Sequence, residues 1–407
     1  MKFDKWTVAL AGAGLVSLAP AAMADEKPSS VMTALASTTL SGYVDTSAQW
    51  NFNTGNANPA PFKFNTPSKA DGFNLDVVQL RIEKPLDESE WAAGYRVDLW
   101  AGPDANTLNT QSSLTHGDFA VRQAYVALRV PCANGLDFKM GVFDSIIGYE
   151  SVESPNNPNY TRSYGHSIEP QTHTGILASY RFSDMVSASF GVANTVGPVI
   201  NSRAFVPVQT FNPYSESYKT YMGSVAITAP ESLGFLSGST LYGGVVNGFN
   251  NSVLGSGLGM PSLNAYVGGT IATPVTGLRL GAAWDLLNLD STVNNPALGK
   301  VKADIWSLAG YASYQATEKL SLHGRFEYVN GDIDEGLTGV TVGNFGRANA
   351  IYATTLTAQY DLWKNVISRV EFRWDHVEHG DAFGGTVPGS PDRADAYMLG
   401  ANIIYKF

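Results

Sequence analysis

The chain lacks any long hydrophobic run beyond its first residues, and this absence excludes helical membrane spans. No stretch after residue 24 holds about 18 or more uninterrupted apolar residues, the length that a helix needs to cross a bilayer. Cysteine is almost absent: Cys132 is alone, so no disulfide can form within the chain. Charged residues make up only 15% of the chain, and acidic residues outnumber basic ones by 36 to 26, which argues against nucleic acid as a partner.

What the chain has instead is glycine and aromatic residues. It contains 41 Gly, 19 Tyr and 19 Phe. This composition suits short alternating strands better than helices. If the protein is integral to a membrane, it must therefore be a β-barrel.

The N-terminus has the pattern of a secretory signal peptide. Lys2 and Lys5 precede an apolar stretch over 7–18, and Ala22-Met23-Ala24 forms an A-x-A cleavage site. We predict a signal peptide over residues 1–24, followed by a polar periplasmic lead-in over residues 25–38. Removal of two bases and one acid with this peptide changes the net charge from -10 to -11.

The C-terminus alternates between apolar and mixed positions and ends on an aromatic residue. Reading back by twos from Phe407 gives Tyr405, Ile403 and Ala401 on one face. Such a stretch is typical of the closing strand of a bacterial outer-membrane barrel, and we expect the barrel assembly machinery to bind it through Phe407. A soluble strand can also end on Phe, so the rest of the chain decides.

About sixteen alternating stretches recur over 39–407, each about 10 to 13 residues long, which is the length of a tilted strand in the hydrocarbon layer. They fall near 39–52, 72–84, 91–100, 119–130, 136–143, 171–182, 185–193, 218–229, 239–249, 263–273, 278–288, 303–316, 320–330, 349–361, 366–377 and 395–407. An even number of strands places both termini of the barrel on one side of the membrane.

Short and long connections alternate strictly between these stretches. The long ones are 53–71, 101–118, 144–170, 194–217, 250–262, 289–302, 331–348 and 378–394. A soluble sandwich or propeller has no reason for this alternation, whereas a membrane barrel has short periplasmic turns and long extracellular loops. The sequence therefore predicts an all-β fold, a closed antiparallel transmembrane β-barrel of about 16 strands over residues 39–407, in the outer membrane and in contact with its lipid.

The alternation also assigns charged residues to the interior. On the lipid face a charge at the bilayer midplane costs about 2 to 4 kcal/mol, so charged positions that alternate with apolar ones must point inward. This places the following residues inside the barrel: Arg81, Arg96, Asp98, Arg325, Glu327, Arg369, Glu371 and Arg373. Because a barrel of this size is too wide for side chains to fill, we expect these charges to face a water-filled channel. The alternative is that neighbouring arginines and carboxylates only pair with one another and brace the wall.

The alternation alone does not assign two groups of residues to a position in the barrel. Arg122 falls on the same face as Ala124, Val126 and Leu128, so we expect it at the outer headgroup boundary. Aromatic residues near the expected strand ends indicate interfacial girdles, although an aromatic path for sugars inside the lumen is an alternative. These residues are Tyr43, Trp50, Trp91, Trp100, Trp284, Trp306, Tyr314, Trp363, Trp374, Tyr397 and Tyr405.

The third long connection carries the most specific motif. Gly141-Val142-Phe143 runs through Gly148-Tyr149-Glu150 and Tyr160-Thr161-Arg162-Ser163 to His173-Thr174-Gly175, and its apolar Ile146 and Ile147 require cover. Together with Ser41-Gly42-Tyr43-Val44-Asp45 and Val121-Arg122-Gln123-Ala124-Tyr125, this block resembles the outer-membrane β-barrel porin family described as OmpL-like, over essentially the whole mature chain.

The resemblance implies a porin: an outer-membrane channel for passive diffusion of small polar solutes or ions. The strand order is also similar to that of general porins, in which the third long loop folds into the lumen. By that likeness loop 144–170 is the candidate constriction, where Asp144, Glu150, Glu153 and Glu169 would face wall arginines such as Arg81, Arg96, Arg325, Arg369 and Arg373. General porins are often homo-trimers, and the likeness extends to that possibility.

Other functions have less support. No G-x-S-x-G elbow and no Ser-His context indicates a hydrolase, so we expect no enzyme, no catalytic residue and no cofactor. Asp375-His376-Val377-Glu378-His379 is rich in ligand types, but His376 and His379 point to opposite faces of a strand, so we expect no metal there. The alternative function is a non-conducting outer-membrane barrel with a structural or adhesive role for its loops.

Overall fold

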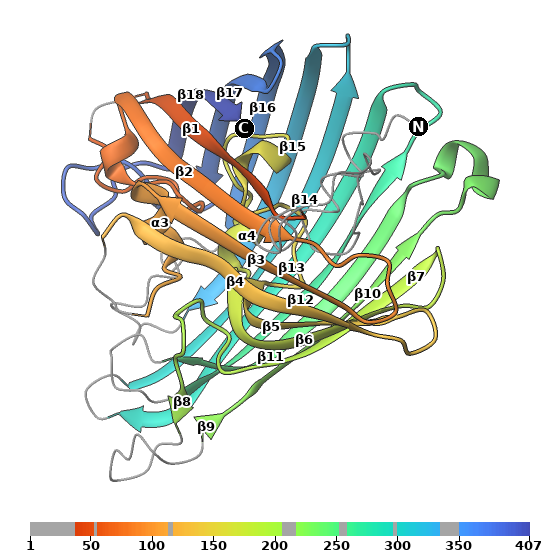
Figure 1. Ribbon diagram of the computed structural model, residues 1–407. Helices are drawn as coiled ribbons and strands as arrows, with labels where there is room; N and C mark the ends of the chain where they lie inside the picture. Colours follow the sequence, from red (N-terminus) through yellow and green to blue (C-terminus); the bar gives the residue numbers. More distant parts are fainter. Residues whose placement is uncertain are drawn as a thin grey trace.

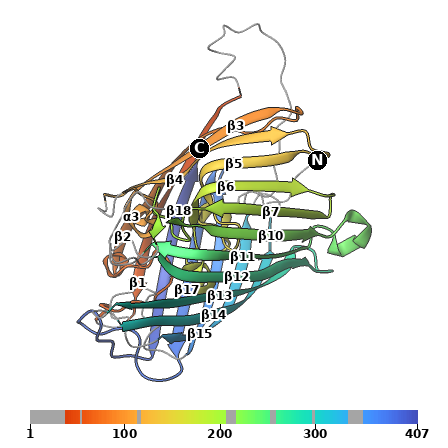
Figure 2. The ribbon, with the colours of Figure 1, turned by 90° about the horizontal axis from the view of Figure 1, so that it is seen from below.

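The chain forms a closed antiparallel barrel in a computed structural model that describes residues 37–52, 55–112, 117–205, 217–251, 259–295, 299–333 and 350–407 (Figures 1 and 2). The expected signal peptide, residues 1–24, and most of the expected lead-in lie outside the described residues. The described ranges hold no helix that is long and apolar enough to cross a membrane.

Sixteen strands make up the wall, as the alternation predicts. In chain order they are β1 (Thr39–Asn51), β2 (Gly72–Lys84), β3 (Ala92–Ala101), β4 (Phe119–Val130), β5 (Leu136–Asp144), β6 (Thr172–Arg181), β7 (Val186–Ala193), β10 (Thr220–Thr228), β11 (Thr240–Asn251), β12 (Gly259–Ala272), β13 (Leu278–Asn295), β14 (Gly299–Gln315), β15 (Leu320–Ile333), β16 (Ala350–Trp363), β17 (Val366–Val377) and β18 (Asp395–Lys406).

The barrel closes between the first and the last strand. Strand β1 pairs with β18 in a register that sets Tyr43 opposite Lys406 and Asn51 opposite Met398. Beyond that register, the amides of Gly42 and Phe407 each donate to the other's carbonyl oxygen at 3.0 Å. Closure leaves neither strand with an unpaired edge, which is the condition for a sheet in lipid.

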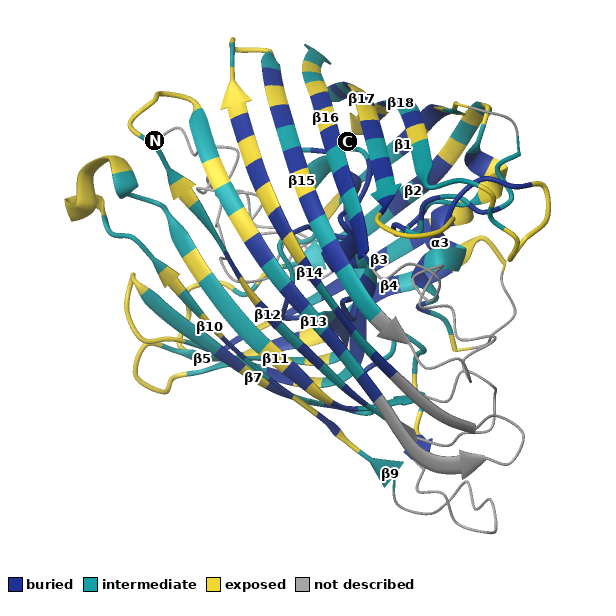
Figure 3. Cartoon of the chain, turned by 180° about the vertical axis from the view of Figure 1, so that it is seen from behind, coloured by how far each residue is buried: buried dark blue, intermediate teal, exposed yellow. Residues whose placement is uncertain are grey.

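Side-chain burial alternates along the strands, as Figure 3 shows for β14 to β17. In β15, Leu322 and Phe326 are 45% and 54% exposed on the outer surface, whereas Arg325 and Glu327, on either side of Phe326, are 2% and 0% exposed. The apolar outer face and the charged inner face of this strand are therefore arranged as the sequence predicts.

Two strands extend well beyond the expected bounds. The predicted long connection 289–302 is wrong, because β13 and β14 continue to pair through Leu289 with Ala303 and Asp290 with Lys302, and pair again at Asn295 with Gly299. Elsewhere, the connection 230–238 contains the 3-10 helix η3 (Glu231–Leu236), and the loop 194–217 ends in a small sheet of β8 (Ala204–Phe205) and β9 (Ser217–Tyr218).

A β-bulge in β4 places Arg122 elsewhere than the sequence predicts. In the pairing of β3 with β4, Asp98 lies opposite Gln123 but Leu99 lies opposite Val121, so Arg122 is an extra residue. The bulge rotates Arg122 inward, where it is 0% exposed, and returns Val126 and Leu128 to the outer face. The expectation that Arg122 sits at the outer headgroup boundary is therefore wrong.

A second bulge acts in the same way on β2. Asp45 of β1 lies opposite Val77 and Thr46 lies opposite Leu75, so Asp76 is the extra residue and is 1% exposed.

The aromatic residues of the expected girdle divide between exposed and buried positions. Trp50, Trp91, Trp363 and Tyr405 are exposed on the outside, but Tyr43 and Trp100 of the expected girdle are buried at 2% and 1%.

Candidate functional site

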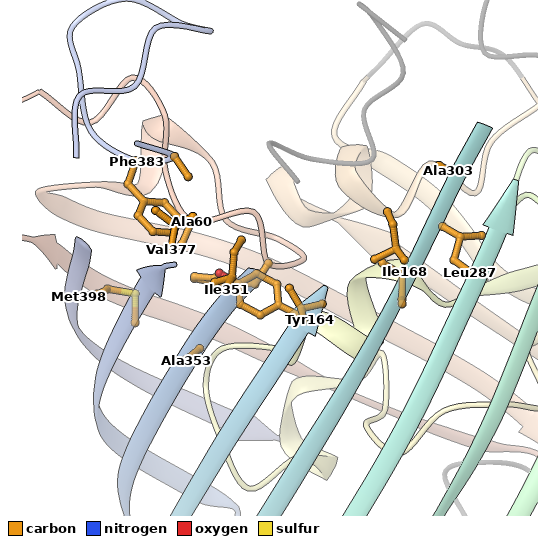
Figure 4. Close-up of a cluster of buried hydrophobic side chains, with 14 of the residues drawn as sticks. Ala60, Tyr164, Ile168, Leu287, Ala303, Ile351, Ala353, Val377, Phe383 and Met398 are labelled. Carbon is orange, nitrogen blue, oxygen red and sulfur yellow. The ribbon is translucent and has the colours of Figure 1, made fainter. Parts of the chain in front are cut away.

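The segment 144–170 lies inside the barrel and contacts the wall on several sides. Its helix α4 (Tyr164–Ile168) contacts β13, β14 and β15. In Figure 4, Tyr164 and Ile168 lie against wall residues that include Ile351 and Leu287. Upstream of α4, the ring of Tyr149 stacks on that of Tyr311 of β14 with centroids 4.1 Å apart. The loop therefore occupies the lumen at the level of the inward-facing charges.

Apolar contacts give this loop the cover that its sequence requires. Ile146 and Ile147 are 5% and 7% exposed and pack in a cluster with Leu177, Met222 and Val246 of the wall. Burial of such side chains stabilises each by roughly 1.5 to 3 kcal/mol relative to exposure. The start of the loop is thus held by hydrophobic packing rather than by charge.

Glu153 anchors the loop to the wall formed by β2, β3 and β4. Its Oε1 atom lies 3.2 Å from Arg96 Nη2 and 3.0 Å from Arg122 Nη1, and it also accepts a hydrogen bond from Arg81. Burial alone would raise the pKa of Glu153, but the charges of Arg122, Arg81 and Arg96 outweigh it and hold the pKa below its usual value.

Asp98 and Asp144 complete this group, which we name the Glu153 cluster: Arg81, Arg96, Asp98, Arg122, Asp144 and Glu153. Asp98 accepts from Arg96, Arg81 and Arg122 at 2.7 to 2.9 Å, and Arg122 Nη2 lies 2.6 Å from Asp144 Oδ2. Three guanidinium groups therefore meet three carboxylates, and the formal charge of the cluster is balanced.

A second cluster, the Glu150 cluster, joins the loop to β15 and β17 and consists of Glu150, Arg325, Glu327, Arg373 and Asp375. Arg325 Nη1 lies 2.9 Å from Glu150 Oε1, and its Nε atom lies 2.7 Å from Glu327 Oε2. Arg373 pairs with Asp375 at 2.8 Å. The Arg373 guanidinium also lies over the rings of Phe62 and Tyr164, at 4.2 and 4.9 Å from their centroids.

Arg369 and Glu371 of β17 bind the loop through its backbone. The amides of Tyr160 and Thr161 donate to the two carboxylate oxygens of Glu371 at 2.6 and 2.9 Å. Arg369 Nη2 donates to the carbonyl oxygens of Ser154 and Asn157 at 3.2 and 2.7 Å. Arg369 therefore meets loop carbonyls and not the loop acids that the general-porin likeness implied.

Glu169 departs from its expected role. It lies beside Asp285 of β13 and His166 rather than beside a wall arginine. Burial and the neighbouring Asp285 raise the pKa of Glu169 well above the usual value. Space for this contact comes from Gly148 and Gly165, because a Cβ atom at either position would clash with one of the two carboxyl groups. Glu169 therefore supplies no negative charge to an arginine.

The charged side chains are enclosed by the loop and by one another. Arg325, Glu327, Glu371 and Arg373 are between 0% and 2% exposed, and Asp98 is 0% exposed. The expectation that these charges face open water is wrong for these residues. Pairing within the wall and with the loop, which the sequence left open as the alternative, describes their contacts.

Open space is present at the end of the barrel that carries the short turns. A cavity of about 700 Å³ lies between the loop segment 155–158 and the turns 273–277 and 364–365. Its charged lining residues are Arg279, Asp361, Lys364 and Lys406. We name this cavity the periplasmic vestibule, since short turns mark the periplasmic end of the barrel.

Two long connections fold over the opposite end. The side-chain amide of Asn58 donates to the carbonyl oxygens of Gly384 and Val387 at 2.7 and 3.0 Å, which ties the loop 53–71 to the loop 378–394. In the first of these loops, Lys69 lies 2.6 Å from both Asp76 and Asp104. Among the described residues no group of three His, Cys, Asp or Glu is placed to hold a metal ion.

Sequence reasoning placed Arg122 at the membrane boundary and so missed it as a member of the Glu153 cluster. The signal for Arg122 was available: Phe119 and Val121 are apolar on one phase and Ala124, Val126 and Leu128 on the other. Such a change of phase within one strand indicates a bulge.

Comparisons with known proteins agree with this architecture. The family model described as "Putative beta-barrel porin-2, OmpL-like" matches residues 37–407. No curated protein matched the sequence. Among solved structures, the outer membrane channel DcaP of Acinetobacter baumannii is similar with a TM-score of 0.56 and 11% identity, over 91% of this chain and 97% of that one.

Two further structures have the same fold at similarly low identity. The in-vitro folded, trimeric form of OmpT, an outer membrane protein of Vibrio cholerae, has a TM-score of 0.56 and 12% identity over 91% of this chain and 99% of that one. An anion-selective porin from Comamonas acidovorans has a TM-score of 0.55 and 13% identity over the same shares, 91% and 99%.

These findings point to a channel of the outer membrane rather than to an enzyme. The family model covers the whole described barrel, and the sixteen-stranded closed sheet is the fold of the outer-membrane porins to which it is similar. The chain belongs to the β-barrel porin-2 family, OmpL-like.

Proposed function

We propose that this porin admits small polar solutes and ions by passive diffusion, and that the loop 144–170 forms its constriction. The observation that carries the proposal is the attachment of one loop to two walls, through Glu153 to Arg81, Arg96 and Arg122 and through Glu150 to Arg325. A loop fixed in this way narrows the lumen through which a solute passes.

Ion selectivity is the property that such a constriction controls. Charges on the outer loops are screened beyond about 10 Å at 0.1 M salt, so the net charge of the whole chain contributes little. The twelve predicted pore-lining residues are proposed to act through the Glu153 and Glu150 clusters, with Arg369, Glu371 and Glu169 positioning the loop.

Reconstitution into a planar bilayer tests the proposal. We expect purified, folded protein to produce stepwise conductance, and neutralisation of Glu150 and Glu153 together to shift the reversal potential in a salt gradient toward anion selectivity. If the double variant conducts with an unchanged reversal potential, the loop does not form the constriction.

A second candidate function is a non-conducting barrel with a structural or adhesive role for its loops. The nearly complete burial of the lumen arginines favours it, since a loop bound on several sides could close the barrel. Absence of conductance from protein that is folded by its electrophoretic mobility would support this function and contradict the channel.

Export and assembly complete the proposal. We expect cleavage of the signal peptide after Ala24, and insertion by the barrel assembly machinery through Phe407. A homo-trimer is supported by the trimeric form of the similar OmpT structure from Vibrio cholerae. Sedimentation of the protein in detergent measures the oligomeric state, and a monomer mass would contradict the trimer.

A further inference from the structure

The periplasmic vestibule carries an excess of positive charge at the mouth of the barrel. Its lining contains three bases, Arg279, Lys364 and Lys406, and one acid, Asp361. Lys364 and Lys406 are exposed, while Arg279 and Asp361 are partly buried. The opposite charges of Glu318 and Lys319, in the neighbouring turn, belong to residues outside this lining.

Arg369 adds a fourth positive charge directly behind the lining of the vestibule. Its Nε atom donates to Gln359 Oε1 at 3.0 Å and its Nη2 atom donates to the Asn157 carbonyl oxygen at 2.7 Å, and both Gln359 and Asn157 line the vestibule. The Nη1 atom of Arg369 is buried without a hydrogen-bond partner, and the residue is 1% exposed.

The charge of Arg369 also differs from that of the arginines in the Glu153 and Glu150 clusters. Arg81, Arg96, Arg122, Arg325 and Arg373 each form an ion pair with a carboxylate. Within the described part of the chain, the contacts of Arg369 are to carbonyl and amide oxygens and include no such ion pair. The carboxylates of Asp45, Glu371 and Asp361 act on it only from beyond ion-pair distance, so its charge is partly balanced and still adds to the potential of the vestibule.

We propose that the periplasmic vestibule is a binding site for small anions that carry two or more negative charges. The inference rests on the proposed channel only in that the same cavity leads to the loop 144–170. A volume of about 700 Å³ accommodates a small polyvalent anion with part of its hydration shell. Ammonium and guanidinium groups neutralise its charge, and the side-chain amides of Asn156 and Gln359, which each donate one hydrogen bond within the protein, add hydrogen bonds through their second N–H.

Binding of inorganic pyrophosphate to the full barrel in non-ionic detergent, measured by titration calorimetry at low ionic strength, tests this site directly. The test variant is Lys364→Gln with Lys406→Gln. The matched control is Arg181→Gln, at the same end of the barrel but outside the vestibule, where the side chains of Arg181 and Asp184 are 63% and 97% exposed. Electrophoretic mobility before and after heating verifies that each variant is folded.

We expect wild type and Arg181→Gln to bind pyrophosphate alike, and the double variant to bind about tenfold more weakly, the effect of two nearby unit charges on a polyvalent anion after screening. In a bilayer of zwitterionic lipid, which offers no competing anionic headgroups, pyrophosphate should block current from one side only. Equal binding by wild type and the double variant would overturn the site, as would equal weakening in Arg181→Gln.

The two proposals fail separately. Folded protein that binds pyrophosphate through Lys364 and Lys406 but does not conduct would contradict the channel and support the site. Protein that conducts normally but binds pyrophosphate independently of these lysines would contradict the site and leave the channel intact.

Discussion

Glu153→Gln is the substitution that tests the loop attachment most directly. Glutamine keeps the shape of the side chain but removes the charge that three guanidinium groups share. The Glu153 cluster then changes from a balanced charge to an excess of one positive charge. Removal of one partner from a buried ion pair costs about 3 to 5 kcal/mol, because the remaining charges stay buried without compensation.

Two consequences follow for permeation. At about 8 Å in a water-like medium, one added unit charge changes the energy of a monovalent ion by about 0.5 kcal/mol, with opposite signs for anions and cations, so after screening the permeability ratio shifts by about two- to fivefold toward anions. Loss of the anchor also loosens residues 151–157, so single-channel conductance should rise. Both are measured in a planar bilayer with a salt gradient.

The matched control is Glu378→Gln, which removes one negative charge from an exposed position on an outer loop. Salt screens a charge at that position, so we expect the Glu378→Gln protein to have the reversal potential and conductance of wild type. Folded Glu153→Gln protein with wild-type conductance and reversal potential would refute the reasoning, because the anchored part of the loop would then not govern the permeation path.

Three further predictions follow from the barrel and its loop. The folded protein should resist SDS at room temperature and change electrophoretic mobility only on heating, since closure pairs the backbone of every wall strand; mobility independent of heating would contradict the closed barrel. Deletion of Phe407, whose backbone pairs with Gly42, should reduce the yield of assembled protein in the outer membrane, whereas normal yield would show that the residue only adds lipid-facing area. In the folded protein the raised pKa of Glu169 favours its protonated form, whereas in the unfolded chain Glu169 ionises once the pH exceeds its ordinary pKa, so the folded state loses stability as pH rises. Glu169→Gln should therefore raise the temperature of the mobility shift at about pH 8 and leave it unchanged at about pH 4. An equal effect at both pH values would contradict a protonated Glu169.

The sequence by itself determined the wall of the barrel. Lipid and the lumen impose opposite polarities on successive residues of a strand, so the period of two marks every wall strand and predicts the inward direction of Arg325, Glu327, Arg369 and Arg373. The closed topology followed as well, because a sheet with an open edge is not stable in lipid. These properties depend on the local pattern of residues and on the lipid and water that surround each strand, so they follow without knowledge of long-range contacts.

Tertiary structure decided how the interior is used. Whether a charge faces water, a carboxylate or a backbone carbonyl depends on where the loop 144–170 lies, and that position results from contacts between residues far apart in the chain, such as Glu150 with Arg325. The pairing of Glu169 with Asp285 is equally non-local. The bulge at Arg122 moves one guanidinium from the expected membrane boundary into the Glu153 cluster, because a single unpaired residue reverses the direction of every side chain beyond it.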